Sequence, residues 1–195
     1  MNKRKTFKII HFFKKNITSS ILFLLGCVGG YQLHDPIAKK SCDTLSPGHT
    51  QMFFSPKGGC QQAIVSTIQQ AKHNIIGSIY CFNSIPIADA LITAHQAGVQ
   101  VRIVVDRSQI NVKNTQLPRL YQHGIPIVVA RGVKIMHEKT LVADGTYIFS
   151  GSFNWTNPAE NANGEIAFLL VSQTLSKDYR QHWEKYWQSG RAYTP

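Results

Sequence analysis

The chain has 195 residues, a length typical of one globular domain, and its 43% content of hydrophobic residues excludes a disordered or fibrous protein. Six basic residues precede residue 17, whereas the first acidic residue is Asp35. Without those six the formal net charge falls from +11 to +5. A moderately basic domain favours a polyanionic partner such as nucleic acid or an anionic membrane, although a basic surface kept for solubility is an equal alternative.

Residues 1–33 have the features of an export signal or membrane anchor. Basic residues come first, an apolar stretch follows, and small and polar residues come next. The apolar stretch is short for a membrane span, which needs about 20 residues, but extended through Leu33 it could act as an uncleaved anchor. Residues 24–27 (LLGC) also resemble a bacterial lipobox, with Cys27 as the lipidated residue. We therefore expect an exported protein of the bacterial periplasm or cell envelope, with residues 34–50 as a polar linker.

Three further cysteines allow one disulfide in an oxidising compartment. They are Cys42, Cys60 and Cys81, and the sequence leaves their pairing open. The chain has no C-x-x-C pair and no histidine at zinc-finger spacing. We therefore expect no metal site and no cofactor.

The domain is expected over residues 51–195 and begins with alternating strands and helices. Apolar and β-branched runs predict strands, and apolar residues at helical spacing predict the helices between them. These elements are a strand at 52–54, a helix at 60–72, strands at 74–82, 99–105 and 125–130, and helices at 86–98 and 117–124. Three strand–helix–strand steps in a row favour an α/β domain with a mixed, largely parallel sheet and helices on both faces.

The second half of the domain changes to an antiparallel pattern. Its predicted elements are strands at 139–143, 147–150 and 166–171 and a final helix at 175–187. Asp144 and Gly145 form a tight turn between the first two strands. Tyr179, Trp183 and Trp187 make a stripe along the final helix, which is more typical of core packing than of a ligand site.

The stretch 137–165 contains the side chains that could take part in catalysis or ligand binding. His137 and Lys139 are two positions apart on a predicted strand, so both should point to one face. The lysine supplies a fixed positive charge, and the imidazole supplies a nucleophile or proton carrier near neutral pH. Ser152 and Asn154 are again two apart and can donate hydrogen bonds to phosphate oxygens. Phosphodiester cleavage requires these kinds of group.

Three neighbouring residues have more than one interpretation. Gly151 permits a close approach of the backbone. Glu165 begins the next strand, where its carboxylate could hold an imidazole in one tautomer. Trp155 could stack on a nucleobase, but core packing explains it equally well.

The stretch resembles the phospholipase D superfamily signature H-x-K-x4-D-x6-G-S-x-N at every fixed position. The matching residues are His137, Lys139, Asp144, Gly151, Ser152 and Asn154. Glu165 resembles the downstream acid of the small bacterial nucleases of this superfamily, and residues 54–59 (FSPKGG) are similar to their opening segment. The resemblance covers about residues 51–190.

The resemblance implies a hydrolase that needs no metal and in which two motifs face each other. One histidine attacks phosphorus and forms a phosphohistidine, and the other protonates the leaving group. Because this chain holds one motif, the resemblance implies a symmetric homodimer with one composite site. It implies catalytic roles for His137, Lys139, Asp144 and Glu165, with Glu165 orienting His137, and phosphate binding by Lys139, Ser152 and Asn154. For Asp144 we favour a structural role, because Asp is common in tight turns.

These observations favour an endonuclease that acts on DNA or RNA. One alternative is a phospholipase D acting on membrane lipids such as cardiolipin. An N-terminus held in the membrane by an anchor, or by lipidation, would support this alternative. Lipases of the superfamily, however, usually carry two motifs in one longer chain. The other alternative is a non-catalytic nucleic-acid binding protein, and the intact motif argues against it.

Overall fold

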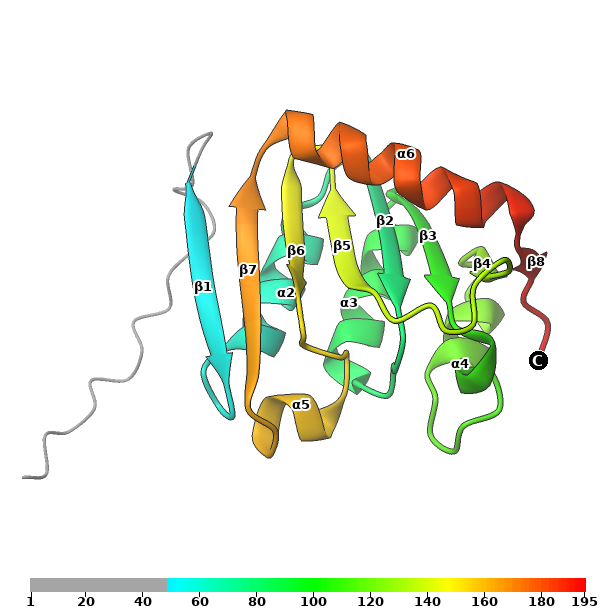
Figure 1. Ribbon diagram of the computed structural model, residues 1–195, viewed down its shortest axis with the longest axis horizontal. Helices are drawn as coiled ribbons and strands as arrows, with labels where there is room; N and C mark the ends of the chain where they lie inside the picture. Colours follow the sequence, from blue (N-terminus) through cyan, green and yellow to red (C-terminus); the bar gives the residue numbers. More distant parts are fainter. Residues whose placement is uncertain (1–48) are drawn as a thin grey trace, which may run out of the picture. The chain divides into compact units, whose positions relative to one another are not determined.

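A mixed sheet of eight strands forms the centre of residues 49–195, the part of the chain that the computed structural model describes (Figure 1). The strand order is β1-β7-β6-β5-β2-β3-β4-β8. The strands are β1 (Thr50–Ser55), β2 (Asn74–Ile79), β3 (Gln100–Val105), β4 (Ile127–Val129), β5 (Lys139–Ala143), β6 (Tyr147–Gly151), β7 (Glu165–Val171) and β8 (Arg191–Ala192). The helices are α2 (Cys60–Gln70), α3 (Ile85–Gln96), α4 (Leu117–Gln122), α5 (Asn157–Asn161) and α6 (Gln173–Ser189), with a 3-10 turn η2 (Arg107–Gln109).

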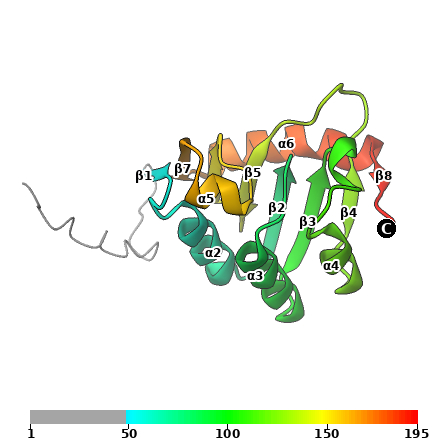
Figure 2. The ribbon, with the colours of Figure 1, turned by 90° about the horizontal axis from the view of Figure 1, so that it is seen from below.

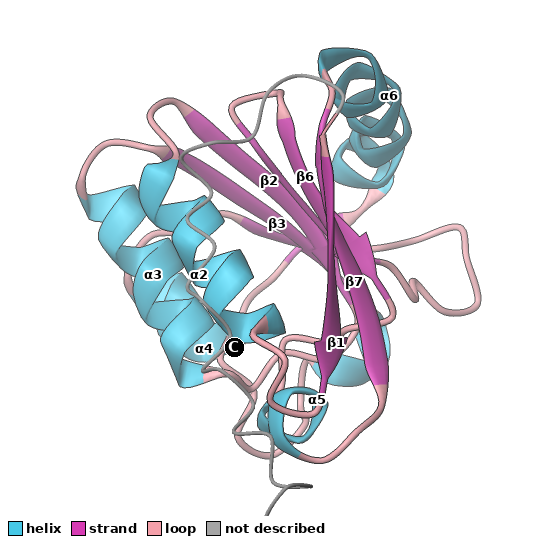
Figure 3. Cartoon of the chain, turned by 90° about the vertical axis from the view of Figure 1, so that its left-hand side faces the viewer, coloured by secondary structure: helices cyan, strands magenta, loops and turns pink. Residues whose placement is uncertain are grey.

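Helices cover both faces of the sheet, as the sequence predicts. Helices α2, α3 and α4 lie on one face and α6 lies on the other (Figures 2 and 3). On the first face, the buried aliphatic side chains of α2 and α3 pack against those of the strands. On the second, Trp183 is fully buried, donates a hydrogen bond to the Gly77 carbonyl at 3.0 Å and stacks on Trp187 with ring centroids 4.9 Å apart. The packing interpretation of the aromatic stripe is thereby confirmed.

The prediction of a mixed sheet is confirmed, but parallel pairing is not dominant. Of the seven strand pairings, only β2–β3 and β3–β4 are parallel. Helices α3 and α4 supply the crossovers that parallel neighbours require. Strand β1, although followed by a helix, lies at the far edge beside β7, and the short connection between β5 and β6 forces them to run antiparallel.

Local sequence signals explain where several elements begin and turn. The Ser84 hydroxyl accepts a hydrogen bond from the Ile87 amide at 3.4 Å, and the next residues open α3 close to the predicted start. The predicted turn joins β5 to β6, with Asp144 and Gly145 at φ angles of 51° and 61°. Trp155 is fully buried and meets Phe82 edge-on, with ring centroids 5.2 Å apart, so it packs in the core instead of stacking on a base.

Several predictions fall outside the described residues. The export signal or anchor at 1–33 is one, and so are all but the last two residues of the linker at 34–50. Cys42 also lies there, whereas Cys60 and Cys81 are both free thiols. Across residues 49–195, none of the helices has the length and apolar character needed to cross a membrane.

Candidate active site

Strand pairing brings the predicted site residues to one edge of the sheet. Lys139 begins β5 and pairs with Ile79 at the end of β2. Glu165 begins β7 and pairs with Ser55 at the end of β1. Because β5 and β7 run against β2 and β6, their first residues meet the carboxyl ends of those strands at the lower edge in Figure 1. His137 precedes β5 at the same edge.

Side-chain alternation places Lys139 and Glu165 on the same face of the sheet. Leu141, two positions after Lys139, belongs to the core under α2 and α3, and so does Ala167, two positions after Glu165. Both site residues therefore point toward this side of the sheet. His137 is two positions before Lys139, so the same alternation places it on this face.

Lys139 is a buried cation that contacts the backbone of His137. Its side chain is 6% exposed, and its Nζ donates a hydrogen bond to the His137 carbonyl at 2.7 Å. The same Nζ lies 5.1 Å from the centroid of the Tyr80 ring. Burial lowers the pKa of the Lys139 ammonium, while the acidic groups of Cys81 and Glu165 oppose that shift. A charge held in this way is available to a phosphate without reorganisation of the site.

The His137 imidazole is exposed, but its backbone is firmly held. The ring packs against Tyr80, with centroids 4.7 Å apart and planes inclined by 59°. The preceding residue, Met136, is buried and donates its backbone N–H to the Asp106 carboxylate at 2.6 Å. On the other side, the Tyr80 amide donates to the Glu138 carbonyl at 3.0 Å. The nucleophile predicted from the sequence is thus solvent-accessible on a fixed support.

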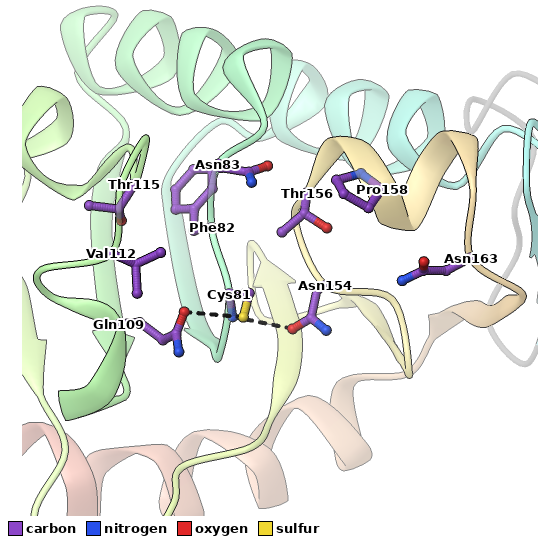
Figure 4. Close-up of a pocket in the computed structure, with 10 residues that line it drawn as sticks. All are labelled: Cys81, Phe82, Asn83, Gln109, Val112, Thr115, Asn154, Thr156, Pro158 and Asn163. Carbon is purple, nitrogen blue, oxygen red and sulfur yellow. Dashed lines mark hydrogen bonds between the residues drawn. The ribbon is translucent and has the colours of Figure 1, made fainter.

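Asn154 presents its amide nitrogen beside a cavity of about 260 Å³ (Figure 4). The Cys81 amide donates to Asn154 Oδ1 at 3.2 Å, which fixes the orientation of the amide group. The Nδ2 group can then donate to a ligand. Cys81 and Gln109 share the cavity wall, where the Cys81 thiol donates to Gln109 Oε1 at 3.1 Å.

Ser152 and Glu165 hold each other, which differs from the expected roles. The Ser152 hydroxyl donates to Glu165 Oε2 at 2.6 Å and accepts from the Ile166 amide at 3.1 Å. Asn163 Nδ2 donates to the other carboxylate oxygen at 3.1 Å. Within the described residues Glu165 therefore has these partners and not the His137 ring. The Ser152 hydroxyl thus links the ends of β6 and β7, and its binding of phosphate stays a prediction.

Asp144 lies at the opposite end of β5 from His137. Its carboxylate accepts hydrogen bonds from the amides of Lys72, His73 and Asn74 at 2.8, 2.8 and 3.0 Å. Burial works against ionisation, but these three N–H groups outweigh it and hold the pKa of Asp144 below its ordinary value. Asp144 thus fastens the loop between α2 and β2 to the hairpin. The structure separates it from the reacting groups, in line with the structural role that we favour.

Three residues of the site were not predicted from the sequence. Tyr80 follows β2 and Asp106 follows β3, so both stand at the carboxyl ends of parallel strands, where open α/β sheets commonly bind ligands. That position is a signal that could have identified them. Asn163 carries no such signal, because only the folded chain brings its amide to Glu165. Within residues 49–195, no three His, Cys, Asp or Glu side chains are grouped as a metal site would require.

Known proteins resemble the chain in sequence and in structure. Residues 64–187 match the family model described as cardiolipin synthase, PLD-like domain. A phospholipase D from Rickettsia prowazekii is 34% identical over 143 residues, covering 73% of this chain and 70% of that protein. A mitochondrial cardiolipin hydrolase from Xenopus tropicalis is 26% identical over 190 residues, covering 96% of this chain and 80% of that protein.

A solved structure has the same fold. The phospholipase D family member Nuc from Salmonella typhimurium superposes with a TM-score of 0.71 and 31% identity. The match covers 75% of this chain and 99% of Nuc. The sequence motif and these comparisons agree, and the chain therefore belongs to the phospholipase D family of phosphodiesterases.

Proposed function

We propose that the protein is a metal-independent endonuclease that hydrolyses DNA or RNA at a composite site formed by two copies of the chain. One observation carries the proposal: the exposed His137 ring and the buried Lys139 ammonium lie at one sheet edge, and both contact the Tyr80 ring. A single chain thereby offers one nucleophile and one fixed cation. A second copy across a twofold axis would bring the second imidazole that the reaction needs.

The reaction then proceeds in two displacements. His137 of one subunit attacks phosphorus, a P–N bond forms, and the P–O bond to the leaving nucleotide breaks. The partner subunit's His137 gives its proton to that leaving oxygen. Water, deprotonated by the same imidazole, next attacks the phosphohistidine, breaks the P–N bond and restores both histidines. Lys139 and the Asn154 amide stabilise the charge on the non-bridging oxygens throughout.

The resemblance of the motif to small bacterial nucleases supports nucleic acid as the substrate, and so does the basic character of the chain. The predicted export signal would place this activity outside the cytoplasm. That location stays a prediction.

A lipid phosphodiesterase is the second candidate. Two relatives are named phospholipase D and cardiolipin hydrolase. In this chain, Val133 and Ile135 are 37% and 51% exposed just before His137. Exposed apolar side chains at this position could contact the acyl region of a membrane.

One set of assays separates the candidates. The purified protein is incubated with supercoiled plasmid, single-stranded RNA and vesicles of phosphatidylcholine and cardiolipin, each with and without excess EDTA. We expect nucleic-acid cleavage that persists in EDTA and is lost in His137→Asn. Hydrolysis of lipid alone would favour the second candidate. Cleavage that disappears on chelation would contradict the metal-independent mechanism.

A further inference from the structure

A second concave surface, which we call the arginine pocket, lies on the same edge of the sheet as His137. Its volume is about 310 Å³. Three arginines from separate parts of the chain border it: Arg107 in η2, Arg131 after β4 and Arg191 at the start of β8. The remaining wall consists of the apolar and glycine residues Val129, Ala130, Gly132 and Val133.

The arginine pocket carries net positive charge. Within the described residues, none of its three guanidinium groups forms an ion pair, whereas Arg102 and Arg119 each pair with a carboxylate. Asp106 precedes Arg107, and attraction between the two charges is one cause of the lowered pKa of Asp106, but its carboxylate is 3% exposed and accepts its hydrogen bonds from the Met136 amide and from Ser108. A hollow surrounded by unpaired guanidinium groups is suited to an anion.

The sheet fixes the position of the arginine pocket relative to the active site. Strands β2, β3 and β4 are parallel neighbours, so their carboxyl ends lie in a row. Strand β5, which begins just after His137, lies next to β2, so three strand spacings separate it from β4, which is roughly 14 Å. The segment 130–138 connects the end of β4 to the start of β5, and it begins with pocket residues and contains His137 (Figure 1). The two sites thus lie on one continuous edge, at a distance that a few nucleotides can bridge.

We propose that the arginine pocket binds a backbone phosphate of the nucleic-acid strand, a few nucleotides from the phosphate that His137 attacks. This inference rests on the proposed function. Arginine forks bind phosphate oxygens in pairs, and a polymer with a phosphate at every residue can occupy both sites at once. A small diester has one phosphate and can occupy only one of them. The arginine pocket therefore makes the enzyme prefer polymeric substrates.

Binding tests the arginine pocket independently of cleavage. All variants are made in the inactive His137→Asn background, and the affinity for a labelled single-stranded oligonucleotide is measured by fluorescence anisotropy over a range of salt concentrations. The test variant is Arg131→Gln/Arg191→Gln, and the control is Lys177→Gln, an exposed cation on α6. We expect roughly tenfold weaker binding for the double variant, and a slope of log affinity against log salt that is smaller by about 0.7, the change for one lost phosphate contact on a single strand. The control should bind as its parent does.

Cleavage assays with the His137 side chain restored complete the test. Oligonucleotide cleavage should fall more in the double variant than hydrolysis of bis(4-nitrophenyl) phosphate does. Equal affinity and equal salt slope in the double variant would overturn the inference. Equal loss on both substrates would also overturn it, because the arginines would then support the active site itself. A wild-type protein that binds the oligonucleotide but never cuts it would contradict the proposed function and leave the binding result standing.

Discussion

The proposed reaction needs Lys139 to be charged, whereas the burial of its side chain disfavours the charge. Its burial lowers the pKa of the ammonium from the ordinary value of 10.5. The unfolded chain therefore holds this proton more tightly, and the cost of folding with a charged Lys139 disappears as pH rises from the folded pKa toward 10.5. The residue is thus expected to lower stability at neutral pH while serving the reaction.

Lys139→Met separates these two effects. We expect activity on DNA to fall roughly 100- to 1,000-fold, as for the loss of one transition-state donor. The free energy of unfolding should stay at the wild-type value or rise by up to about 1 kcal/mol, because a desolvated charge is removed. Urea denaturation and plasmid cleavage measure the two quantities. A variant that is less stable and still active would contradict this account of Lys139.

Asp144 should behave in the opposite way, although it belongs to the same motif. Asp144→Asn keeps a residue that tolerates a positive φ but cannot accept all three backbone hydrogen bonds as strongly. We expect a loss of about 2 kcal/mol in the free energy of unfolding, with activity per folded molecule near the wild-type value. Urea titrations followed by circular dichroism and active-site normalised rates check this.

The pH dependence of the same variant gives a second readout. Since the folded pKa of Asp144 lies below the ordinary 3.8, its contribution is present above 3.8 and is lost as pH falls through the folded value. The difference in stability between wild type and Asp144→Asn should therefore shrink in strong acid. A difference that stays constant down to this range would argue against the capping role.

Sequence spacing alone predicted the positions of some site residues better than those of others. The period of two in a strand was sufficient to bring His137 and Lys139 together, because both lie on or beside one strand. Glu165 was placed at the correct edge, but its partners were not foreseen. Ser152 reaches it across β6 and β7, and a hydrogen bond between strands depends on register, which local sequence does not encode.

Gly151 connects the motif to the geometry of a whole strand pair. Its φ is +148°, and an added Cβ would lie 2.2 Å from the Ile166 carbonyl oxygen and 2.8 Å from the Ala167 Cα. These are backbone atoms of the adjacent strand, so β6 and β7 would have to separate. The close approach expected from the sequence is confirmed, and it is a requirement of strand packing.

Gly151→Ala should therefore destabilise the fold and disturb the site together. We expect a loss of about 3 kcal/mol in the free energy of unfolding, from contact strain and unfavourable φ. Gly164→Ala is a matched control, since a Cβ there meets nothing within 4 Å and its φ is not strained. Thermal unfolding of both variants decides the matter, and equal melting temperatures would show that the strands can separate at no cost.

At the level of elements, local patterns predicted most helices and strands but not their arrangement. The hairpin β5–β6 and helices α2, α3 and α6 lie close to the predicted ranges, because periodicity and turn residues are local signals. Helix α5 and strand β8 have five and two residues, too few to show a period. The position of β1 beside β7 arises from pairing between residues more than 100 positions apart, which no local pattern reveals.

Considered as a whole molecule, one chain presents half of the machinery that the proposed reaction needs. His137 is exposed at an edge of the sheet, and Glu138 faces elsewhere, where its carboxylate pairs with His182 at 2.6 Å. The second imidazole of the mechanism would therefore come from another copy. This requirement distinguishes a shared site from two independent ones by stoichiometry alone.

Mixed dimers provide the measurement. Wild type and His137→Asn are unfolded together in varied proportions, refolded, and assayed for cleavage of plasmid DNA at constant total protein. If each site needs both imidazoles, activity follows the square of the wild-type fraction, and an equal mixture retains roughly one quarter of full activity. If each chain acts alone, the same mixture retains one half. Size-exclusion chromatography confirms that the subunits have reassociated, so a linear response in reassembled dimers would show that each histidine works without its counterpart.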